Sequence, residues 1–262
     1  MSYLMESSKE GQRLIQQENA NPSSVRLVQA GLSAGQHVAD LGCGSGAVIP
    51  AILDIVGSSG SVTGVDLSPD RVEEARARLS ASPNVTVQLG ELYATGLPDR
   101  KFDFTWSQFV FEYLRHPEVA LREMIRVTRP GGTVAIADID GIGLAFWPRP
   151  QVIEEGIEPF MSALGSTGFD FYIGRKLFTY FRKAGLQDVK VHLSPFYISP
   201  GADPRLVADY QQRFEVLAPI AIKSFGDEQR YWRFAHAFLA LLADPDALKY
   251  AVALTVVGQR PA

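Results

Sequence analysis

Cysteine is almost absent from this sequence of 262 residues, which contains only Cys43. A single thiol excludes an internal disulfide, and it excludes any metal site built from several cysteines. Cys43 lies inside a glycine-rich turn, where we interpret it as a packing residue and not as a nucleophile. The four histidines are spread along the chain, and we expect no metal site.

The sequence also lacks long hydrophobic runs and runs of basic residues. No apolar stretch approaches the roughly 20 residues that cross a membrane, and the first residues lack the pattern of a signal peptide. We therefore expect a cytoplasmic protein without a membrane span. The formal net charge of −4 argues against a nucleic-acid partner, because such partners normally require a basic face. The expected partner is a small-molecule substrate, and the sequence leaves the oligomeric state open.

What the sequence does contain is a short apolar strand that runs directly into alternating glycines, at residues 38–46. Glycine tolerates positive φ and has no Cβ, so Gly42 and Gly44 allow a sharp turn that lies close to a ligand. The apolar residues 47–53 that follow predict a buried helix. A strand, a glycine turn and a helix N-terminus together place unpaired N–H groups where a polar ligand group can meet them.

Two acids decide which ligand this turn favours. Asp40 stands two residues before the first glycine, where a carboxylate suits a ligand that carries a cationic amine. Asp66 ends the next apolar run, roughly 20 residues on, where an acid accepts hydrogen bonds from a ribose diol. An amino-acid end and a ribose end together describe S-adenosylmethionine (SAM). A nicotinamide cofactor fits less well, because a dinucleotide site usually continues its apolar strand at the position of Asp40.

With these motifs the sequence resembles the class I SAM-dependent methyltransferases, in which residues 40–46 correspond to the first motif and Asp66 to the second. The resemblance covers residues 37–138. The turn at residues 129–132 (RPGG) strengthens it, especially to the small-molecule branch that includes the quinone methyltransferases. By this resemblance Glu91 binds the adenine amino group and Leu92 stacks on the ring, although aspartate is usual at the position of Glu91.

The pattern of strands and helices predicts an α/β fold with a doubly wound, Rossmann-like sheet of seven mostly parallel strands. Residues 251–257 are apolar throughout, as in a strand buried on both faces, and residues 189–193 alternate as in an edge strand. This contrast fits the family's sheet, in which the last strand is antiparallel and lies beside the sixth. We expect one methyltransferase domain over 1–262, with a helical leader over 1–31, an irregular segment over 140–172, and a helical insertion over 200–245 that is a possible substrate lid.

The fourth predicted strand ends at Ser107-Gln108-Phe109-Val110, at the edge where ligands bind in open α/β sheets. Nucleic-acid N-methyltransferases carry an Asn/Asp-Pro-Pro-aromatic tetrad here, so a small, largely apolar or aromatic metabolite is the expected methyl acceptor. The candidate cofactor-binding residues share positions at the ends of the first four strands: Asp40, Gly42, Gly44, Asp66, Leu67, Glu91, Leu92, Ser107 and Gln108.

No catalytic residue is named from the sequence, because methyl transfer from a sulfonium needs little beyond alignment of the reacting atoms. A general base is required only for an acceptor that arrives protonated. His236, Asp138 and Asp140 are the candidates for such a base. Two alternatives stay open: a non-catalytic SAM-binding protein and, less favoured, a nicotinamide-dependent oxidoreductase. The acceptor atom, which can be O, N or C, is not determined.

Overall fold

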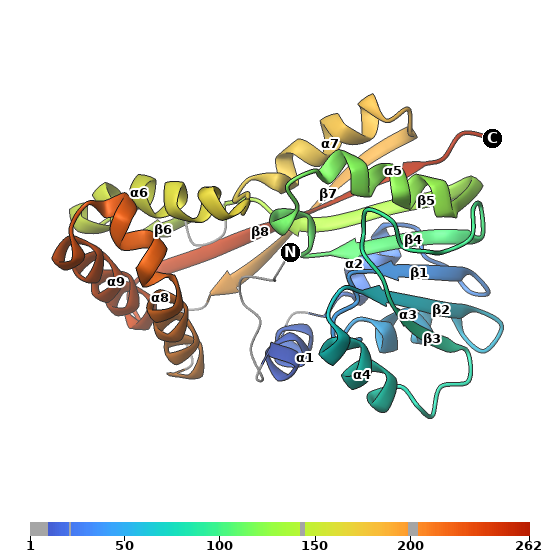
Figure 1. Cartoon of the computed structure of the whole chain (residues 1–262), viewed down its shortest axis with the longest axis horizontal. Coiled ribbons are helices and arrows are strands. Elements are labelled where there is room, and N and C mark those ends of the chain that lie inside the picture. The colour runs from blue at the N-terminus through green and yellow to red at the C-terminus, as the bar shows by residue number, and fades with distance from the viewer. Residues whose placement is uncertain (1–9, 21, 142–144, 199–203) are drawn as a thin grey trace.

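The computed structural model describes residues 10–20, 22–141, 145–198 and 204–262. Its strands are β1 (His37–Leu41), β2 (Ser61–Asp66), β3 (Val85–Leu89), β4 (Phe102–Gln108), β5 (Thr128–Ile139), β6 (Ala145–Trp147), β7 (Gln187–Ile198) and β8 (Leu248–Gln259). Its helices are α1 (Glu10–Ala20), α2 (Ser24–Gln29), α3 (Ile49–Val56), α4 (Pro69–Arg78), the short 3-10 helix η1 (Phe111–Tyr113), α5 (Pro117–Val127), α6 (Gln151–Thr167), α7 (Ile173–Lys183), α8 (Pro204–Phe225) and α9 (Glu228–Ala243) (Figure 1).

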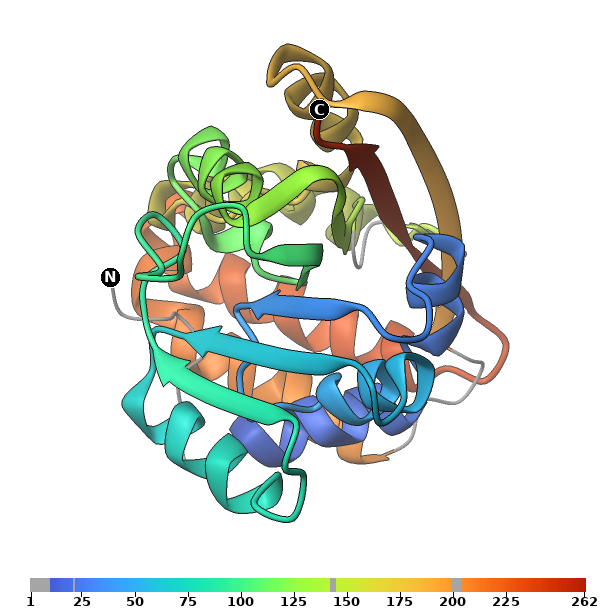
Figure 2. The ribbon, with the colours of Figure 1, turned by 90° about the vertical axis from the view of Figure 1, so that its right-hand side faces the viewer.

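The described strands form one sheet in the order β3-β2-β1-β4-β5-β8-β6, with β7 paired to β8. Strands β1 to β5 are parallel, and the arrows of β1, β2 and β3 run side by side in Figure 2. β8 runs antiparallel between β5 and β7. The predicted fold is therefore confirmed, including the inner position of the last strand. The three-residue strand β6 is an addition that the sequence analysis did not predict.

Two hydrophobic clusters hold helices on opposite faces of this sheet. Buried residues of α5 and α7 pack on one face and buried residues of α2, α3 and α4 on the other. The residues Ser68-Pro69-Asp70 predict a capped helix start, and α4 begins in this way, since the Ser68 hydroxyl accepts the N–H of Arg71 and Pro69 stands at the first helical position. Because helices cover both faces, β1, β4 and the second half of β5 are almost wholly buried.

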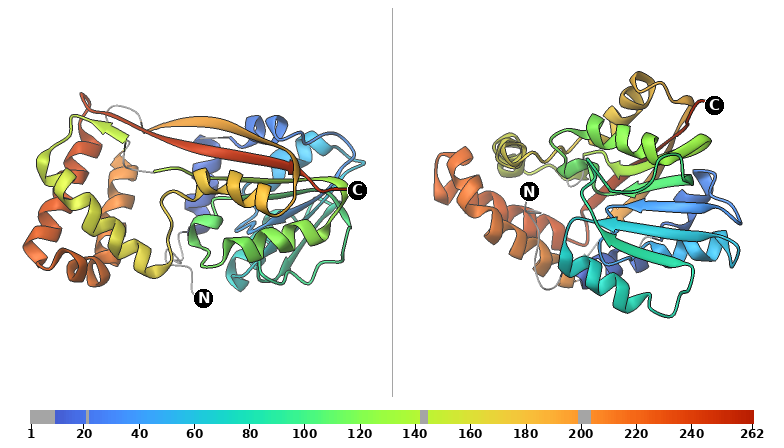
Figure 3. Two further views of the ribbon diagram at one scale, coloured as in Figure 1. Left: turned by 90° about the horizontal axis from the view of Figure 1, so that it is seen from above. Right: turned by 45° about the vertical axis from the view of Figure 1, so that its right-hand side comes forward.

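A third cluster unites α6, α8 and α9 at the end of the molecule toward which the parallel strands point (Figures 1 and 3). The prediction of irregular structure over 140–172 was wrong, because α6 occupies residues 151–167. Gly156 and Pro159 resemble helix breakers, yet both lie inside this helix. A Cβ at position 156 would lie 2.1 Å from a ring atom of Phe234. Glycine is therefore what allows α6 to approach α9 this closely.

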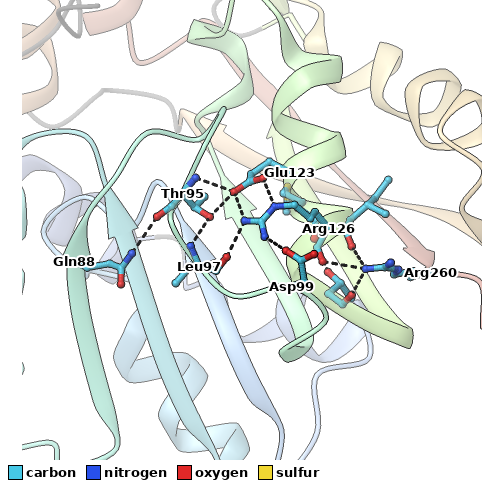
Figure 4. A network of polar contacts seen from close by, with 10 residues as sticks. Gln88, Thr95, Leu97, Asp99, Glu123, Arg126 and Arg260 are labelled. Atoms are coloured by element: carbon cyan, nitrogen blue, oxygen red, sulfur yellow. Dashed lines mark hydrogen bonds and ion pairs between the residues drawn. The ribbon is translucent and has the colours of Figure 1, made fainter.

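A polar network fastens α5 to the loop before β4, as Figure 4 shows. Glu123 of α5 is 7% exposed. It accepts hydrogen bonds from the Thr95 N–H at 2.8 Å and the Thr95 hydroxyl at 2.5 Å, and it pairs with Arg126 at 2.7 Å. Arg126 also bonds the Leu97 carbonyl and pairs with Asp99. Arg126 first, and then the Thr95 hydrogen bonds, lower the pKa of Glu123 to about 2.

We expect Glu123→Gln to lower the free energy of unfolding by about 2–3 kcal/mol at pH 7, since each pKa unit corresponds to roughly 1.4 kcal/mol. The folded pKa lies below the unfolded value, so this stabilisation is complete above about pH 4.5 and disappears as the pH falls toward 2. Urea unfolding at pH 7 and pH 3 measures it. Glu73→Gln, which removes an exposed ion pair with Arg76, is the control and should change little. An equal loss at both pH values would contradict the prediction.

Candidate functional site

The glycine turn after β1 has the backbone that the sequence predicts. Gly42 and Gly44 adopt φ values of +81° and +54°. The N–H of Gly42 donates to the Val65 carbonyl of β2 at 2.8 Å. A Cβ at Gly42 would lie 2.5 Å from Val110 Cγ2, so the segment after β4 packs directly on the turn. Glycine is therefore required here for both the dihedral angle and the close approach.

Asp66, at the end of β2, holds the turn in place. Its Oδ2 accepts the N–H of Gly44 at 2.7 Å, and its Oδ1 accepts the N–H of Ser68 at 2.9 Å. A carboxylate offers about four acceptor positions, so these bonds are compatible with hydroxyl groups of a ligand on the same side chain. Leu67, the next residue, is 45% exposed. Asp66, the second motif, thus holds the glycine turn of the first motif in place and still has acceptor positions for a ligand.

Asp40 is a buried carboxyl group of the site with incomplete hydrogen bonding among the described residues. It is 2% exposed, and its Oδ2 has no hydrogen-bond partner among the described residues. Trp106 pairs with Asp40 in the register of β4 and β1, and its buried Nε1 also lacks a partner in that part of the chain. Burial, followed by the charges of Asp66 and Glu18, raises the pKa of Asp40 to about 7. Three neighbouring carboxylates and an orphaned oxygen favour a cationic ligand and disfavour a pyrophosphate.

The leader covers this turn. The Ser45 hydroxyl donates to the Gly11 carbonyl at 3.3 Å, and a Cβ at Gly44 would lie 2.9 Å from Leu14 Cδ1. Helix α1 therefore lies on the glycine turn. It is held partly by Glu18, which bonds the N–H of Ser23 at 2.7 Å.

Gln108 joins the leader to the end of β4. Its Oε1 lies 2.9 Å from the Ser23 hydroxyl and 3.3 Å from Arg26 Nε. The sequence predicts a helix that starts at Ser23 or Ser24 with a serine cap, but Ser23, which precedes α2, makes no side-chain cap hydrogen bond there. The Ser23 hydroxyl instead hydrogen-bonds with the side chains of Glu18 and Gln108. The leader is thus linked to two of the strand ends that carry candidate site residues.

The other candidate residues differ in what they present to a ligand. Glu91 is exposed in the turn after β3, where its carbonyl accepts the N–H of Ala94. Leu92 is 6% exposed and packs in the core beside Val65, so it offers little surface for stacking. Ser107 is fully buried and donates to the Leu41 carbonyl at 2.7 Å, which ties β4 to β1.

The three base candidates of the sequence analysis are engaged elsewhere. His236 lies exposed on α9 and stacks on Trp232. Asp140 makes two hydrogen bonds with Arg175, at 2.7 and 3.0 Å. Asp138 is buried and accepts three backbone N–H groups. All three side chains thus make other contacts among the described residues, and the choice of a base stays open.

The aromatic side chains gather at a different place from the one expected. The sequence predicts seven aromatic residues at the ligand-bearing edge: Phe109, Phe111, Trp147, Phe171, Tyr172, Phe196 and Tyr197. Phe111 and Phe171 are buried in core clusters, Phe109 and Tyr172 pack partly buried against these clusters, and Trp147 is 68% exposed. The side chains of Phe196 and Tyr197 lie outside the described part of the structure. The main aromatic cluster belongs instead to α6, α8 and α9, and its members within ring contact are Phe160, Tyr210, Phe214, Phe225, Tyr231, Phe234 and Phe238. The helical period of the sequence predicts an apolar face with Tyr210 and Phe214 and another with Tyr231 and Phe238. Helix α6, which the sequence analysis did not predict, packs against both faces.

Comparisons with known proteins find likenesses to methyltransferases. A family model described as "Methyltransferase domain" matches residues 39–136. A 2-methyl-6-phytyl-1,4-hydroquinone methyltransferase of Synechocystis is 30% identical over 154 residues, which are 52% of this chain and 47% of that protein. A demethylmenaquinone methyltransferase of Staphylococcus aureus is 34% identical over 104 residues, 40% of this chain and 43% of that protein. The matches thus span less than half the length of each of these two relatives.

Among solved structures, a SAM-dependent methyltransferase from Aquifex aeolicus superposes with a TM-score of 0.51 at 22% identity. The superposition covers 72% of this chain and 92% of that one. At this level of identity the likeness concerns the fold, which is the Rossmann-like sheet described above.

Proposed function

We propose that this protein is a class I, SAM-dependent methyltransferase that transfers a methyl group from SAM to a small, largely apolar or aromatic molecule. The match of residues 39–136 to a methyltransferase domain supports this proposal. The observation that carries the proposal is Asp40, a buried carboxyl beside a glycine turn, whose Oδ2 has no hydrogen-bond partner among the described residues. Such a group is costly to bury unless a ligand pairs with it. SAM carries the ammonium and the sulfonium that this negative site favours.

The residues at the strand ends fit SAM in complementary ways. Asp40 would accept from the ammonium, and the turn at Gly42 and Gly44 would lie against the amino-acid portion. Asp66 would accept from the ribose hydroxyls, while Leu67 and Glu91 would line the adenine end. Bound SAM supplies an electrophilic methyl group on a sulfonium sulfur. The protein then has to orient the acceptor behind that methyl and exclude water.

The leader over 1–31 and the insertion over 200–245 would supply this enclosure within a single domain. Helix α1 lies on the glycine turn, and α8 and α9 stand beyond the ends of the parallel strands (Figure 1). Aromatic side chains of α8 and α9 contact one another, as in the stacked pair Tyr210 and Phe238 at 5.7 Å between ring centroids. An aromatic or apolar acceptor suits such walls. The two relatives named above are methyltransferases of hydroquinone and menaquinone type by name.

A partner with a phosphate backbone is not part of the proposal, since the formal net charge is −4. Among the described residues, every helix is too short or too polar to span a lipid bilayer.

The test is release of S-adenosylhomocysteine when the protein is incubated with SAM and panels of candidate acceptors. We expect release with members of an aromatic small-molecule panel, and none with total RNA or with a peptide library. Calorimetry with SAM and with NADH on the same protein separates the alternatives. Tighter binding of NADH would overturn the assignment, and SAM binding without release on any panel would favour a non-catalytic SAM-binding protein.

A further inference from the structure

Two buried polar atoms on neighbouring strands lack hydrogen-bond partners among the described residues. They are Asp40 Oδ2 on β1 and Trp106 Nε1 on β4. The two residues pair in the register of these parallel strands, so both side chains project from the same face of the sheet, on strands about 4.8 Å apart. Trp106 is fully buried and Asp40 is 2% exposed. An acceptor and a donor without partners in this part of the chain therefore stand next to each other, beside the glycine turn.

The two atoms are complementary in what they require from a ligand. An indole N–H can only donate, and an ionised carboxyl oxygen can only accept. Buried polar groups are nearly always paired in folded proteins, so each exception requires an explanation. Asp40 Oδ2 and Trp106 Nε1 do not bond to each other, since neither has a partner in the described chain. A ligand group that carries a cationic donor and an anionic acceptor on one carbon would satisfy both, and an α-amino acid group is of this kind.

Helix α2 covers the face of the sheet that carries these two atoms. Trp106 belongs to the hydrophobic cluster that includes Leu27 of α2. Gln108 follows Trp106 by two residues and therefore projects from the same face, toward the strand end. Its Oε1 lies 3.3 Å from Nε of Arg26, a residue of α2 that is 3% exposed. A buried guanidinium thus lies at the end of β4, on the same face as Trp106.

Charges of opposite sign occupy the two sides of this site. Asp40 and Asp66 lie at the ends of β1 and β2, where Asp66 holds the N–H of Gly44. On the β4 side, Arg26 Nη2 lies 3.0 Å from the Ser23 hydroxyl, which also bonds Glu18 at 2.6 Å. Positive charge near the strand end of β4 stabilises a carboxylate there, while the acids of β1 and β2 stabilise an ammonium. The charges therefore favour one orientation of an α-amino acid group.

We propose that Trp106 donates its indole N–H to the carboxylate of SAM, beside the ammonium that Asp40 accepts, and so selects a cofactor with an intact α-amino acid group. The inference rests on the proposed function and adds a binding residue to the same site. Trp106 contacts the cofactor in this arrangement, whereas Arg26 supplies positive charge on the carboxylate side. An aliphatic or phenylalanine side chain at position 106 would fill the core but could not donate.

The experiment compares two ligands on the full chain. Decarboxylated SAM keeps the sulfonium, the amine, the ribose and the adenine, and lacks only the carboxylate. Calorimetry gives the Kd of both ligands for the wild type, for Trp106→Phe, and for a variant with β-(3-benzothienyl)alanine at position 106, in which sulfur replaces the N–H in a ring of nearly the same shape. We expect the wild type to prefer SAM by about 10- to 150-fold, as for a hydrogen bond to a charged group. Both variants should lose this preference, and the benzothienyl variant should keep its Kd for decarboxylated SAM within about twofold.

A second measurement follows the indole N–H directly. Nitrogen-15 labelling gives one indole signal for each of the three tryptophans, Trp106, Trp147 and Trp232. Trp147 is 68% exposed, and Trp232 Nε1 lies 3.4 Å from Glu228 Oε1. We expect the Trp106 signal to move when SAM is added and to stay near its free position with decarboxylated SAM, while the other two stay in place. Trp232→Phe removes the same group from α9 and is the control, which should keep the preference for SAM.

The other outcomes overturn one proposal or the other. Equal losses for the two ligands in the Trp106 variants would mark this residue as structural. A Trp106 signal that SAM does not move would show that its N–H meets an internal water or no ligand at all, and a wild type without preference would remove the carboxylate contact. Each of these results overturns the inference and leaves the proposed function in place. Failure of the wild type to bind either ligand would overturn the proposed function itself.

Discussion

Asp40→Asn is expected to weaken SAM binding by about 10- to 150-fold while making the ligand-free protein more stable. The first effect follows from the loss of a charge-assisted hydrogen bond, which contributes about 1.5–3 kcal/mol. Because the pKa of Asp40 is about 7 without ligand, binding of a cation to the ionised form releases a proton. Calorimetry between pH 6 and 8 should therefore show affinity that rises with pH in the wild type and is nearly constant in the variant.

The second effect of Asp40→Asn concerns the free energy of unfolding. The folded pKa of Asp40, about 7, lies above the ordinary aspartate value. The unfolded chain therefore binds fewer protons between about pH 4 and 7, and stability falls as the pH rises through this window. The full cost above pH 7 is up to roughly 4 kcal/mol. An asparagine amide still buries polar atoms, so we expect a net gain of about 1–3 kcal/mol at pH 8 and none near pH 4.

Urea unfolding at pH 8 and at pH 4 measures this gain. The matched control is Asp54→Asn, which makes the same chemical change at an exposed position of α3 and should alter neither stability nor SAM affinity. A variant that is less stable than the wild type at pH 8, or that binds SAM as tightly, would remove Asp40 from the proposed site.

Gly42→Ala should destabilise the protein by about 2–4 kcal/mol and weaken SAM binding at least about tenfold. Alanine at φ +81° costs about 1–2 kcal/mol, and its Cβ would meet Val110 Cγ2 at 2.5 Å, which adds an overpacking cost of about 1–3 kcal/mol. Either the turn or Val110 must move, and both border the proposed site. Thermal unfolding and calorimetry with SAM measure the two effects.

Gly185→Ala separates the two causes in Gly42→Ala. Gly185 has φ +82°, and a Cβ there would meet no atom within 4 Å, so this variant carries the dihedral cost alone. Adding Val110→Ala to Gly42→Ala should recover the overpacking part, which a double-mutant cycle measures. Equal losses in Gly42→Ala and Gly185→Ala, or no recovery with Val110→Ala, would show that the contact with Val110 is unimportant.

Much of this protein is determined by residues that lie close together in the sequence. The alternating glycines after Asp40 predict a turn with positive φ, and a run of apolar residues over 251–257 predicts a strand buried on both faces. The structure has the turn, and β8 is buried on both faces over residues 255–258, while Val252 and Leu254 are half-buried. Such patterns are reliable because the dihedral preference of glycine and the period of a strand are local properties. The parallel sheet then follows from the alternation of strands and helices.

Helix α6 is an element that the local sequence pattern does not predict. Glycine and proline inside residues 151–167 weaken any helical pattern, since each lowers intrinsic helix propensity. What stabilises this helix is burial against α8 and α9, whose residues lie more than 35 positions further along the chain. The energy of that packing exceeds the propensity cost, and no window of the sequence contains both partners.

Some features of the candidate site also follow from the local sequence, and others follow only from the tertiary structure. The sequence alone determined that acids and glycines occupy the ends of the first two strands. Only the tertiary structure decided that the Asp40 oxygen is left without a partner in the described chain, and that Gln108 is joined to Ser23, 85 residues away. It also decided that Asp138 accepts the N–H groups of Phe111 and Glu112. Burial and charge depend on which distant segments meet at the edge of the sheet, and the local pattern of residues does not contain that information.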